Sequence, residues 1–373
     1  MSDPTRPELQ PQAGYTEGLP SSPRPIVILG AGGIVRDAHL PAYAKAGFPL
    51  ASLYTWAPHR ARAVELAQAY GIAEVYTDLA QAVAAAPAGA VFDIALMPDQ
   101  FVAALESLPD GSGVLIQKPF GQNLAEAREL LRICRRKHLV AAVNTQLRFA
   151  PYISAARALI ASGAIGELYD LEVHVNVKTP WELFPQVLTL DRLEINMHSV
   201  HYLDLVRSFL GDPDSVSAVT ERHPEHTHAN SRSVILLRYR DRALRVVVST
   251  NHDHHFGPAY QDSYVKWEGT RGAVRAQMGL NMSYPTGGPD LLEYQLNADA
   301  AEVDAERVWT PLPFEGSWFP DAFIGSMSVV HRFLEGSIDK LPTSVEDVYK
   351  TMALVDAAYE SAAREGVAPE YQP

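Results

Sequence analysis

Residues 25–43 read PIVILGAGGIVRDAHLPAY, and this stretch decides the fold of the first half of the chain. Four apolar residues at 26–29 run directly into a glycine-rich turn at 30–33, and an amphipathic run begins near Ile34. A short buried strand, a glycine turn and a helix start form the first unit of a dinucleotide-binding sheet. The alternative is a glycine loop in an ordinary α/β protein, which this stretch alone does not exclude.

The residues of this turn have separate roles in the dinucleotide interpretation. Gly30 permits the tight turn, and Gly32 lets the backbone approach a pyrophosphate. Gly33 and Ile34 lead into the helix, whose N-terminus would face the phosphate charge. Val35 stands where the fingerprint has its third glycine, so helix–strand packing must differ there. We expect Gly30, Gly32, Gly33 and Ile34 to bind the cofactor.

The strand–helix alternation continues to about residue 145. Strands that alternate with helices at a short pitch predict a parallel, doubly wound sheet. Residues 25–145 are therefore expected to form one Rossmann-type dinucleotide-binding domain, after a flexible, proline-rich tail at 1–24. We expect strands at 49–54, 73–76, 90–97, 114–116 and 140–143, and helices at 38–46, 61–70, 78–86, 101–108 and 124–137.

The end of the second strand carries the signal for the type of cofactor. An acidic residue there usually binds the ribose 2′-hydroxyl of NAD. This chain has Thr55, with Arg60 and Arg62 close behind, and a hydroxyl with cations suits a 2′-phosphate better. We expect NADP in preference to NAD, in contact with Thr55 and Arg60. The alternative is that both arginines are solvated on the next helix.

Composition limits the partners. The chain has 373 residues, enough for two domains, and its formal net charge of -13 argues against nucleic acid or an anionic membrane as a partner. The single cysteine, Cys134, cannot form an internal disulfide, which fits a reducing compartment. No apolar run is long enough to cross a bilayer, and the tail lacks the apolar core of a signal peptide. We expect a cytoplasmic protein that acts on small molecules.

The fifth strand delivers Gln117, Lys118 and Pro119 to the carboxyl edge of the sheet, where ligands of such folds bind. Pro98 follows the fourth strand and reaches the same edge. A lysine beside a reacting carbonyl or alcohol can donate a proton and stabilise negative charge. We expect Pro98, Gln117 and Lys118 to contact the cofactor and Lys118 to be catalytic. The alternative is a solvated lysine at a strand end.

Three motifs in a fixed order give the chain a family resemblance. The glycine loop is followed by Lys118-Pro119, then by QLRFAP at 146–151 and GAIGE at 163–167. In this order the chain resembles the glucose–fructose oxidoreductase, inositol dehydrogenase and rhizopine-catabolism family, written Gfo/Idh/MocA, over nearly its whole length after the tail. The family's usual Glu-Lys-Pro reads Gln117-Lys118-Pro119, and Val102 stands where the family has a histidine after Pro98.

From Gly166 the period of the apolar pattern changes. Apolar and polar residues alternate over 171–178, which predicts a strand buried on one face. Residues 146–373 are therefore expected to form an α+β substrate-binding domain with an open, mostly antiparallel sheet. One face should pack on helices and the other form a homodimer or homotetramer interface, as the resemblance also implies. The further strands expected are 235–239, 244–248, 264–268 and 273–278.

A helix expected at 195–210 carries the remaining chemistry. At helical pitch Glu194, His198 and His201 fall on one face. Imidazole carries protons near neutral pH, so His201 would take the proton of a secondary alcohol as its hydride leaves for the nicotinamide. The alternative is a pair of satisfied core histidines.

The resemblance supports the same helix. The family places an Asp four residues before a His and a second Asp three residues after it, and His201 and Asp204 match the last two positions. Met197 occupies the first, so His198 or Asn196 is expected to take that role. His198 is thus a candidate catalytic residue beside Lys118 and His201, and a possible substrate contact together with Asn196.

Other polar residues are candidates for the substrate pocket. Trp181 and Arg192 lie before the helix, where an aromatic face and a guanidinium could cover a sugar. Arg148 follows the domain crossover, and His252 closes a hairpin strand. Two histidine groups suggest a metal instead, but hydride transfer requires none and we expect none. These groups are His223, His226 and His228, and the run Asn251-His252-Asp253-His254-His255.

These observations predict an NAD(P)-dependent oxidoreductase that acts on a hydroxyl or carbonyl of a sugar, cyclic polyol or related small molecule. Two alternatives stay open. Relatives of the family use a tightly bound cofactor for elimination or glycoside cleavage. The neutral residues Gln117 and Met197 also allow a cofactor-binding regulator without turnover.

Overall fold

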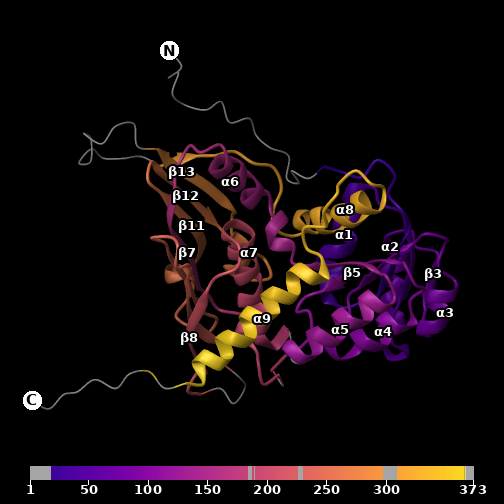
Figure 1. The fold of residues 1–373 in the computed structure, drawn as a ribbon. Coiled ribbons are helices and arrows are strands. Elements are labelled where there is room, and N and C mark those ends of the chain that lie inside the picture. Colours follow the sequence, from indigo (N-terminus) through magenta and orange to yellow (C-terminus); the bar gives the residue numbers. More distant parts are fainter. Residues whose placement is uncertain are drawn as a thin grey trace, which may run out of the picture.

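The computed structural model describes residues 18–183, 187–188, 190–225, 230–296, 309–364 and 366. Two sheets organise this part of the chain, one of six strands and one of eight. Figure 1 shows three helices between the eight-stranded sheet and the first domain: α6 (Pro151–Ala161), α7 (Val200–Leu210) and α9 (Val345–Ala362). The site described below lies where these two halves meet.

The first sheet confirms the doubly wound prediction. Its strands run in the order β3-β2-β1-β4-β5-β6, and each neighbouring pair is parallel. The order reverses beside β1, which opens a crevice at the carboxyl ends of the strands. The strands are β1 Ile26–Leu29, β2 Leu50–Tyr54, β3 Glu74–Tyr76, β4 Val91–Ile94, β5 Gly113–Gln117 and β6 Val140–Asn144.

Helices connect these strands as the alternation predicted, with small differences at their ends. A π-helical turn, Val35–His39, precedes α1, so the regular helix begins later than the amphipathic run indicated. The fourth strand ends at Ile94, three residues before the expected Met97. The helices are α1 Leu40–Ala46, α2 Arg60–Ala69, α3 Leu79–Ala84, α4 Phe101–Ser107 and α5 Leu124–Arg136.

The second sheet is mixed and mostly antiparallel. Its order is β14-β13-β12-β11-β7-β10-β9-β8, and only β7 and β10 are recorded as a parallel pair among the described strands. Three of its strands, β8, β13 and β14, were not expected from the sequence. The strands are β7 Leu168–Asn176, β8 Ser215–Glu221, β9 Arg232–Arg238, β10 Arg245–Asn251, β11 Asp262–Gly269, β12 Gly272–Gln277, β13 Leu291–Leu296 and β14 Thr310–Pro311.

Helices α6 Pro151–Ala161, α7 Val200–Leu210 and α9 Val345–Ala362 pack on one face of this sheet. Helix α8 Asp321–Leu334 packs against the first domain, on α1 and β5. On α8, the Phe323 ring lies 4.8 Å from that of His39 in the first domain. At the start of α9, Ser344 bridges to Ala142 of β6. The C-terminal helices therefore join the two halves into one body (Figure 1).

The described end of the predicted tail, residues 18–24, is held against α8. The backbone N–H of Ser21 donates to the Glu335 carboxylate at 3.0 Å, and that of Arg24 donates to His331 Nδ1 at 3.3 Å. Residues 18–24 are therefore not a free tail, and the proline-rich composition did not predict their contact with the end of α8. Within the described residues, no helix is both long and apolar enough to span a membrane.

Candidate active site

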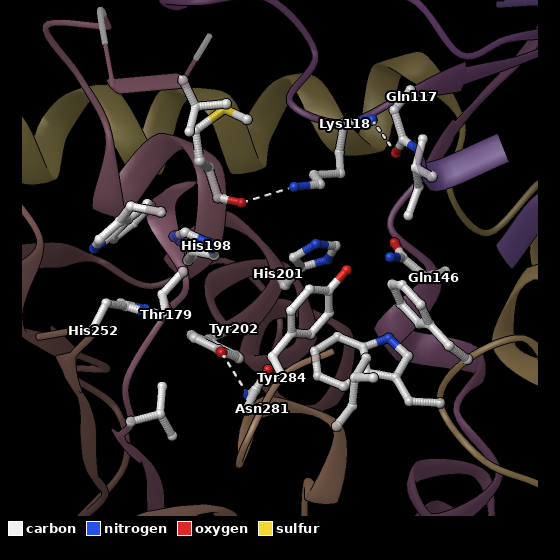
Figure 2. Close-up of a pocket in the computed structure, with 18 residues that line it drawn as sticks. Gln117, Lys118, Gln146, Thr179, His198, His201, Tyr202, His252, Asn281 and Tyr284 are labelled. Carbon is white, nitrogen blue, oxygen red and sulfur yellow. Dashed lines mark hydrogen bonds between the residues drawn. The ribbon is translucent and has the colours of Figure 1, made fainter. Parts of the chain in front are cut away.

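A cavity of about 190 Å³ lies between the two halves of the molecule. Figure 2 shows that Lys118, from the end of β5, and His201, from α7, both point into it. Ile34, beside the glycine turn, also lines the cavity, so the predicted cofactor crevice and the predicted catalytic helix meet in one place. Most of the wall is apolar or aromatic.

Lys118 is placed by the last residue of β5 and by the turn that follows. Its Nζ donates to the Met197 carbonyl at 2.8 Å, and its backbone N–H donates to Gln117 Oε1 at 2.8 Å. Burial lowers the pKa of Lys118 to about 8. The amine is therefore cationic at neutral pH, yet it gives up its proton far more readily than an ordinary lysine.

His198 and His201 reach the same cavity from successive helical segments. His198 lies on a π-helical turn, Ile195–Ser199, and His201 on α7. Burial lowers the pKa of both imidazoles well below the usual value, and the Lys118 charge lowers both further. Both rings are therefore neutral at neutral pH and can accept a proton. The Nδ1 atom of each has no hydrogen-bond partner in the part of the chain that the structure describes.

Glu194 does not line the cavity with these histidines, contrary to the helical-face prediction. Its carboxylate accepts hydrogen bonds from Ser199 Oγ at 2.6 Å and from Ser233 Oγ. The wider π-helical turn between Glu194 and α7 changes the angular spacing that a regular helix would give. Glu194 instead lies outside the cavity. Its Oε1 atom is 3.7 Å from Nε2 of His252, which lines the cavity.

His252 and Trp181 line the cavity, and their contact with substrate stays a prediction. The His252 ring stacks on that of His198 at a centroid distance of 4.2 Å, and the Trp181 ring lies edge-on to His198 at 5.5 Å. Thr179 Oγ1 is 2.9 Å from His252 Nδ1 and fixes the orientation of the ring. Thr179, Trp181 and His252 lie in the segments that follow β7 and β10, so the ends of these two parallel strands build this side of the wall.

Six lining residues with polar groups were not predicted from the sequence. Gln146 follows β6 at the carboxyl edge of the first sheet, and the same edge rule that selected Lys118 could have found it. The others lie on α7 or in loops far along the chain, where no pattern marked them. They are Trp318 and five residues labelled in Figure 2: Gln146, Thr179, Tyr202, Asn281 and Tyr284.

Arg148 lies outside the cavity, contrary to its predicted place in the cleft. Its guanidinium donates to Asp204 at 2.6 Å and to Asp347 at 2.7 Å, and it also donates to the Pro342 carbonyl at 3.1 Å. These partners come from α7, α9 and the loop before α9. Arg148 therefore links the segment after β6 to α7 and α9. Its geometry does not support the predicted contact with substrate.

Replacing Arg148 with alanine should lower the free energy of unfolding by about 3–5 kcal/mol, because Asp204 would stay buried without its cation. Asp204 has a side-chain exposure of only 1%. Thermal and denaturant unfolding would measure the loss. Arg132→Ala removes an exposed pair with Glu129 and should change the free energy of unfolding far less, because solvent screens that pair. Equal, small losses in both variants would contradict the structural role.

Three predicted ligand contacts border a second hollow, of about 340 Å³, rather than the cavity. These are Pro98, Arg192 and Asn196. Arg192 pairs with Asp356 and lies over the Tyr359 ring at 4.7 Å, and Asn196 Nδ2 donates to the Gln122 carbonyl at 3.2 Å. The substrate roles predicted for Arg192 and Asn196 therefore have no support in the cavity. Pro98 remains at the predicted sheet edge.

The glycine turn fits a dinucleotide. Gly30 has a φ of +127°, and a Cβ there would meet the Ala95 carbonyl oxygen at 2.3 Å, so only glycine is accommodated. A Cβ on Gly32 would meet nothing within 4 Å, which leaves open space above the turn for a phosphate. Thr55 directly follows β2, and Arg60 is the first residue of α2 and is exposed.

The histidine groups considered for a metal are only partly described. His226 and His228 lie outside the described residues. Among the described residues, no group of three or more His, Cys, Asp or Glu side chains could hold a metal ion.

Family models match both halves of the chain. The model described as an oxidoreductase family with an NAD-binding Rossmann fold matches residues 24–145, and that of the GFO/IDH/MocA C-terminal domain matches residues 153–275. The chain therefore belongs to the Gfo/Idh/MocA family and is an NAD-binding oxidoreductase, a hydride-transferring enzyme of the dehydrogenase type. The resemblance inferred from the sequence motifs is confirmed.

Individual relatives agree with this assignment. The chain is 27% identical to a D-apiose dehydrogenase of Rhizobium rhizogenes, over 67% of this chain and 70% of that protein. An oxidoreductase of Agrobacterium radiobacter, solved with NAD+, L-tartaric acid and magnesium, has a TM-score of 0.73 at 23% identity, covering 92% of this chain and 97% of that one. Levoglucosan dehydrogenase, solved with NADH and levoglucosan, gives 0.69 at 17% identity, covering 92% and 98%.

Proposed function

We propose that this enzyme transfers a hydride between NAD(P) and a secondary hydroxyl or ketone of a small sugar or cyclic polyol, with Lys118 and His201 moving the proton. The observation that carries the proposal is the shared cavity: an amine from the first domain and an imidazole from the second line it together, next to Ile34 of the glycine turn.

The two side chains have complementary tasks. NAD(P), when bound, supplies the acceptor or donor of the hydride. In alcohol oxidation the neutral His201 imidazole accepts the hydroxyl proton, while the Lys118 ammonium stabilises the negative charge that develops on the oxygen. Gln117 and Ile34 line the same cavity and would border the nicotinamide. The apolar wall excludes water and strengthens these electrostatic interactions.

The wall suits a small ring with several hydroxyl groups. Five buried polar atoms around the cavity have no hydrogen-bond partner among the described residues: Gln146 Oε1, His198 Nδ1, His201 Nδ1, His252 Nε2 and Trp318 Nε1. Such atoms cost free energy until a ligand satisfies them, so they favour hydroxyl-bearing substrates. Trp181 offers an aromatic face for C–H groups. The names of the relatives, D-apiose dehydrogenase and levoglucosan dehydrogenase, agree with this substrate class.

NADP remains our proposed cofactor over NAD. Thr55 offers a hydroxyl at the end of β2, and exposed Arg60 and Arg62 open α2. A 2′-phosphate would gain from these cations, whereas no acidic residue stands at position 55 to bind a free 2′-hydroxyl. Dissociation constants for NADPH and NADH, measured by fluorescence, decide between them. Tighter NADH binding that is insensitive to Arg60→Ser would contradict the preference.

We also propose a homodimer or homotetramer through the outer face of the eight-stranded sheet. Val219, Val234 and Leu236 on β8 and β9 are exposed to 62%, 44% and 48%, which is unusual for neighbouring apolar side chains on one sheet face. In the described part of the chain, α6, α7 and α9 cover the opposite face (Figure 1). A monomeric mass by light scattering would refute the association.

The pH dependence of carbonyl reduction should follow Lys118. Its pKa of about 8 means that the stabilising ammonium is present at neutral pH and is lost as the pH rises above about 8. We therefore expect kcat/KM for reduction to fall through that range. Initial rates measured in overlapping buffers give this fall of kcat/KM with pH. A value of kcat/KM that keeps rising well above the pKa of Lys118 would contradict a role for the cationic amine.

The experiment that tests the function is a screen of cyclic polyols and sugars with NAD(P)+, and of their ketones with NAD(P)H, followed by nicotinamide absorbance. Sustained change over many turnovers is expected for a dehydrogenase. Product formation without net absorbance change would indicate elimination or glycoside cleavage with a recycled cofactor. Cofactor binding without product from any compound would favour a regulator and contradict the proposal.

A further inference from the structure

A buried chain of polar groups connects the interior of the first domain with the turn that carries Lys118. Asp93 lies inside β4, and its Oδ2 is 2.6 Å from His39 Nδ1. On the other side of the imidazole, His39 Nε2 is 3.1 Å from Gln117 Nε2. Gln117 Oε1 then accepts the backbone N–H of Lys118 at 2.8 Å. Asp93 and His39 are fully buried, and Gln117 is 7% exposed.

The chemistry of the groups fixes the direction of every bond in this chain. An ionised carboxylate only accepts hydrogen bonds, so His39 must carry its proton on Nδ1. The Nε2 atom of the neutral ring is then an acceptor, which requires the amide nitrogen of Gln117 to face it. The amide oxygen consequently faces the other way, toward the Lys118 N–H. The Asp93 carboxylate at one end of the chain and the Lys118 N–H at the other thus require the same orientation of the Gln117 amide.

We propose that Asp93, His39 and Gln117 are positioning residues that hold the Lys118 turn, and with it the amine, in the geometry needed at the cavity. The inference rests on the catalytic role proposed for Lys118. His39 and Asp93 do not line the cavity and act only through Gln117. The arrangement is similar to a catalytic triad, in which a carboxylate sets the tautomer of a histidine. Here the imidazole contacts the Gln117 amide instead of a nucleophile.

The neutral amide at position 117 is part of this device. A glutamate there would accept hydrogen bonds only, so His39 would need protons on both nitrogens and would lie as a cation between two buried carboxylates. It would also place a negative charge beside Lys118 and stabilise the ammonium. The other titratable groups that line the cavity with Lys118 are His198, His201, His252, Tyr202 and Tyr284.

Asp93→Asn tests the chain with almost no change of shape. Asparagine removes the charge that selects the His39 tautomer, so we expect His39 to populate both tautomers and kcat to fall by about 10- to 100-fold while KM for substrate changes little. Tyr43→Phe is the matched control: it removes a hydroxyl that donates to Asp93 Oδ2 at 2.8 Å and lies 3.3 Å from His39 Nδ1, and it keeps all three residues of the chain. It should retain the tautomer and the activity of the parent enzyme.

Gln117→Glu provides a second arm that does not depend on turnover. Titration of lysine ε-carbons by NMR, with the Lys118 signal assigned by its loss in Lys118→Met, should show a proton dissociation constant about tenfold lower in Gln117→Glu. Nitrogen shifts of His39 should report an Nδ1–H tautomer in the parent protein and in Tyr43→Phe.

The outcomes separate the two proposals. If the tautomer and the Lys118 titration behave as stated but no substrate turns over, the positioning chain stands and the proposed dehydrogenase role fails. If Asp93→Asn matches Tyr43→Phe in kcat and in the His39 tautomer, or if Gln117→Glu leaves the Lys118 titration unchanged, the positioning proposal is overturned.

Discussion

Replacing Lys118 with methionine should lower kcat by about 10²- to 10⁴-fold and leave the dissociation constant of NAD(P)H within a few-fold of the parent value. Methionine retains much of the lysine stem, so the apolar wall around the cavity is preserved. It removes the cation that stabilises charge on the substrate oxygen, and this interaction matters most in the transition state. Steady-state rates and cofactor fluorescence titrations give both quantities.

A matched control shows whether the effect belongs to this amine. Lys350 pairs with Asp212 on the surface and has a side-chain exposure of 58%. Lys350→Met should retain the parent kcat. If Lys118→Met also kept more than about half of the activity, the amine would have no part in the chemistry, since loss of a general acid or base costs far more.

Replacing His201 with asparagine should lower kcat/KM by about 10²- to 10³-fold in the direction of alcohol oxidation, because asparagine cannot accept the hydroxyl proton. His201 is buried, and burial together with the nearby Lys118 charge holds its pKa well below the ordinary value. The ring is therefore unprotonated at neutral pH and can accept the hydroxyl proton. Progress curves with the best substrate of the screen provide the measurement.

His198→Asn is the comparison that assigns the base. His198 stacks on His252 and shares the cavity, so its loss should chiefly raise KM. If His198→Asn abolished turnover while His201→Asn left kcat intact, His198 would be the base, and His201 would not. The double variant of Lys118 and His201 should be hardly slower than the worse single variant, because groups that act as a unit are not additive.

The first domain could be predicted almost completely from the sequence, and the physical reason is local. Most strands there are short apolar runs, and each connection is a helix with a glycine or polar boundary, so the alternation itself predicts a parallel sheet. The glycine turn at Gly30 and the position of Lys118 at the end of β5 follow from the same pattern. These features depend on neighbours in the chain.

The parts that sequence reasoning missed depend on residues far apart in the chain. Arg148 looked like a free cation in the cleft, but its partner Asp347 lies 199 residues away. The π-helical turn before α7 moved Glu194 off the face it was expected to share with His201, and regular helical spacing gives no signal for such a turn. Trp318 and Asn281 enter the cavity from loops, where neither period nor composition indicates direction.

The role of Gln117 is a further example. Beside Lys118 in the sequence, it reads as a neutral residue where a charge partner is usual. In the fold, it is the last member of a chain that begins at Asp93 and passes through His39. Each of these three residues comes from a different element, so only the three-dimensional arrangement relates them.

The most direct test of the account is a crystal structure of the enzyme with NAD(P)H bound. We predict that the nicotinamide ring lies in the cavity between Lys118 and His201, with its reactive carbon facing the space that both side chains border. A nicotinamide that binds elsewhere, with these two groups on the far side of a closed wall, would contradict the proposed proton-transfer pair.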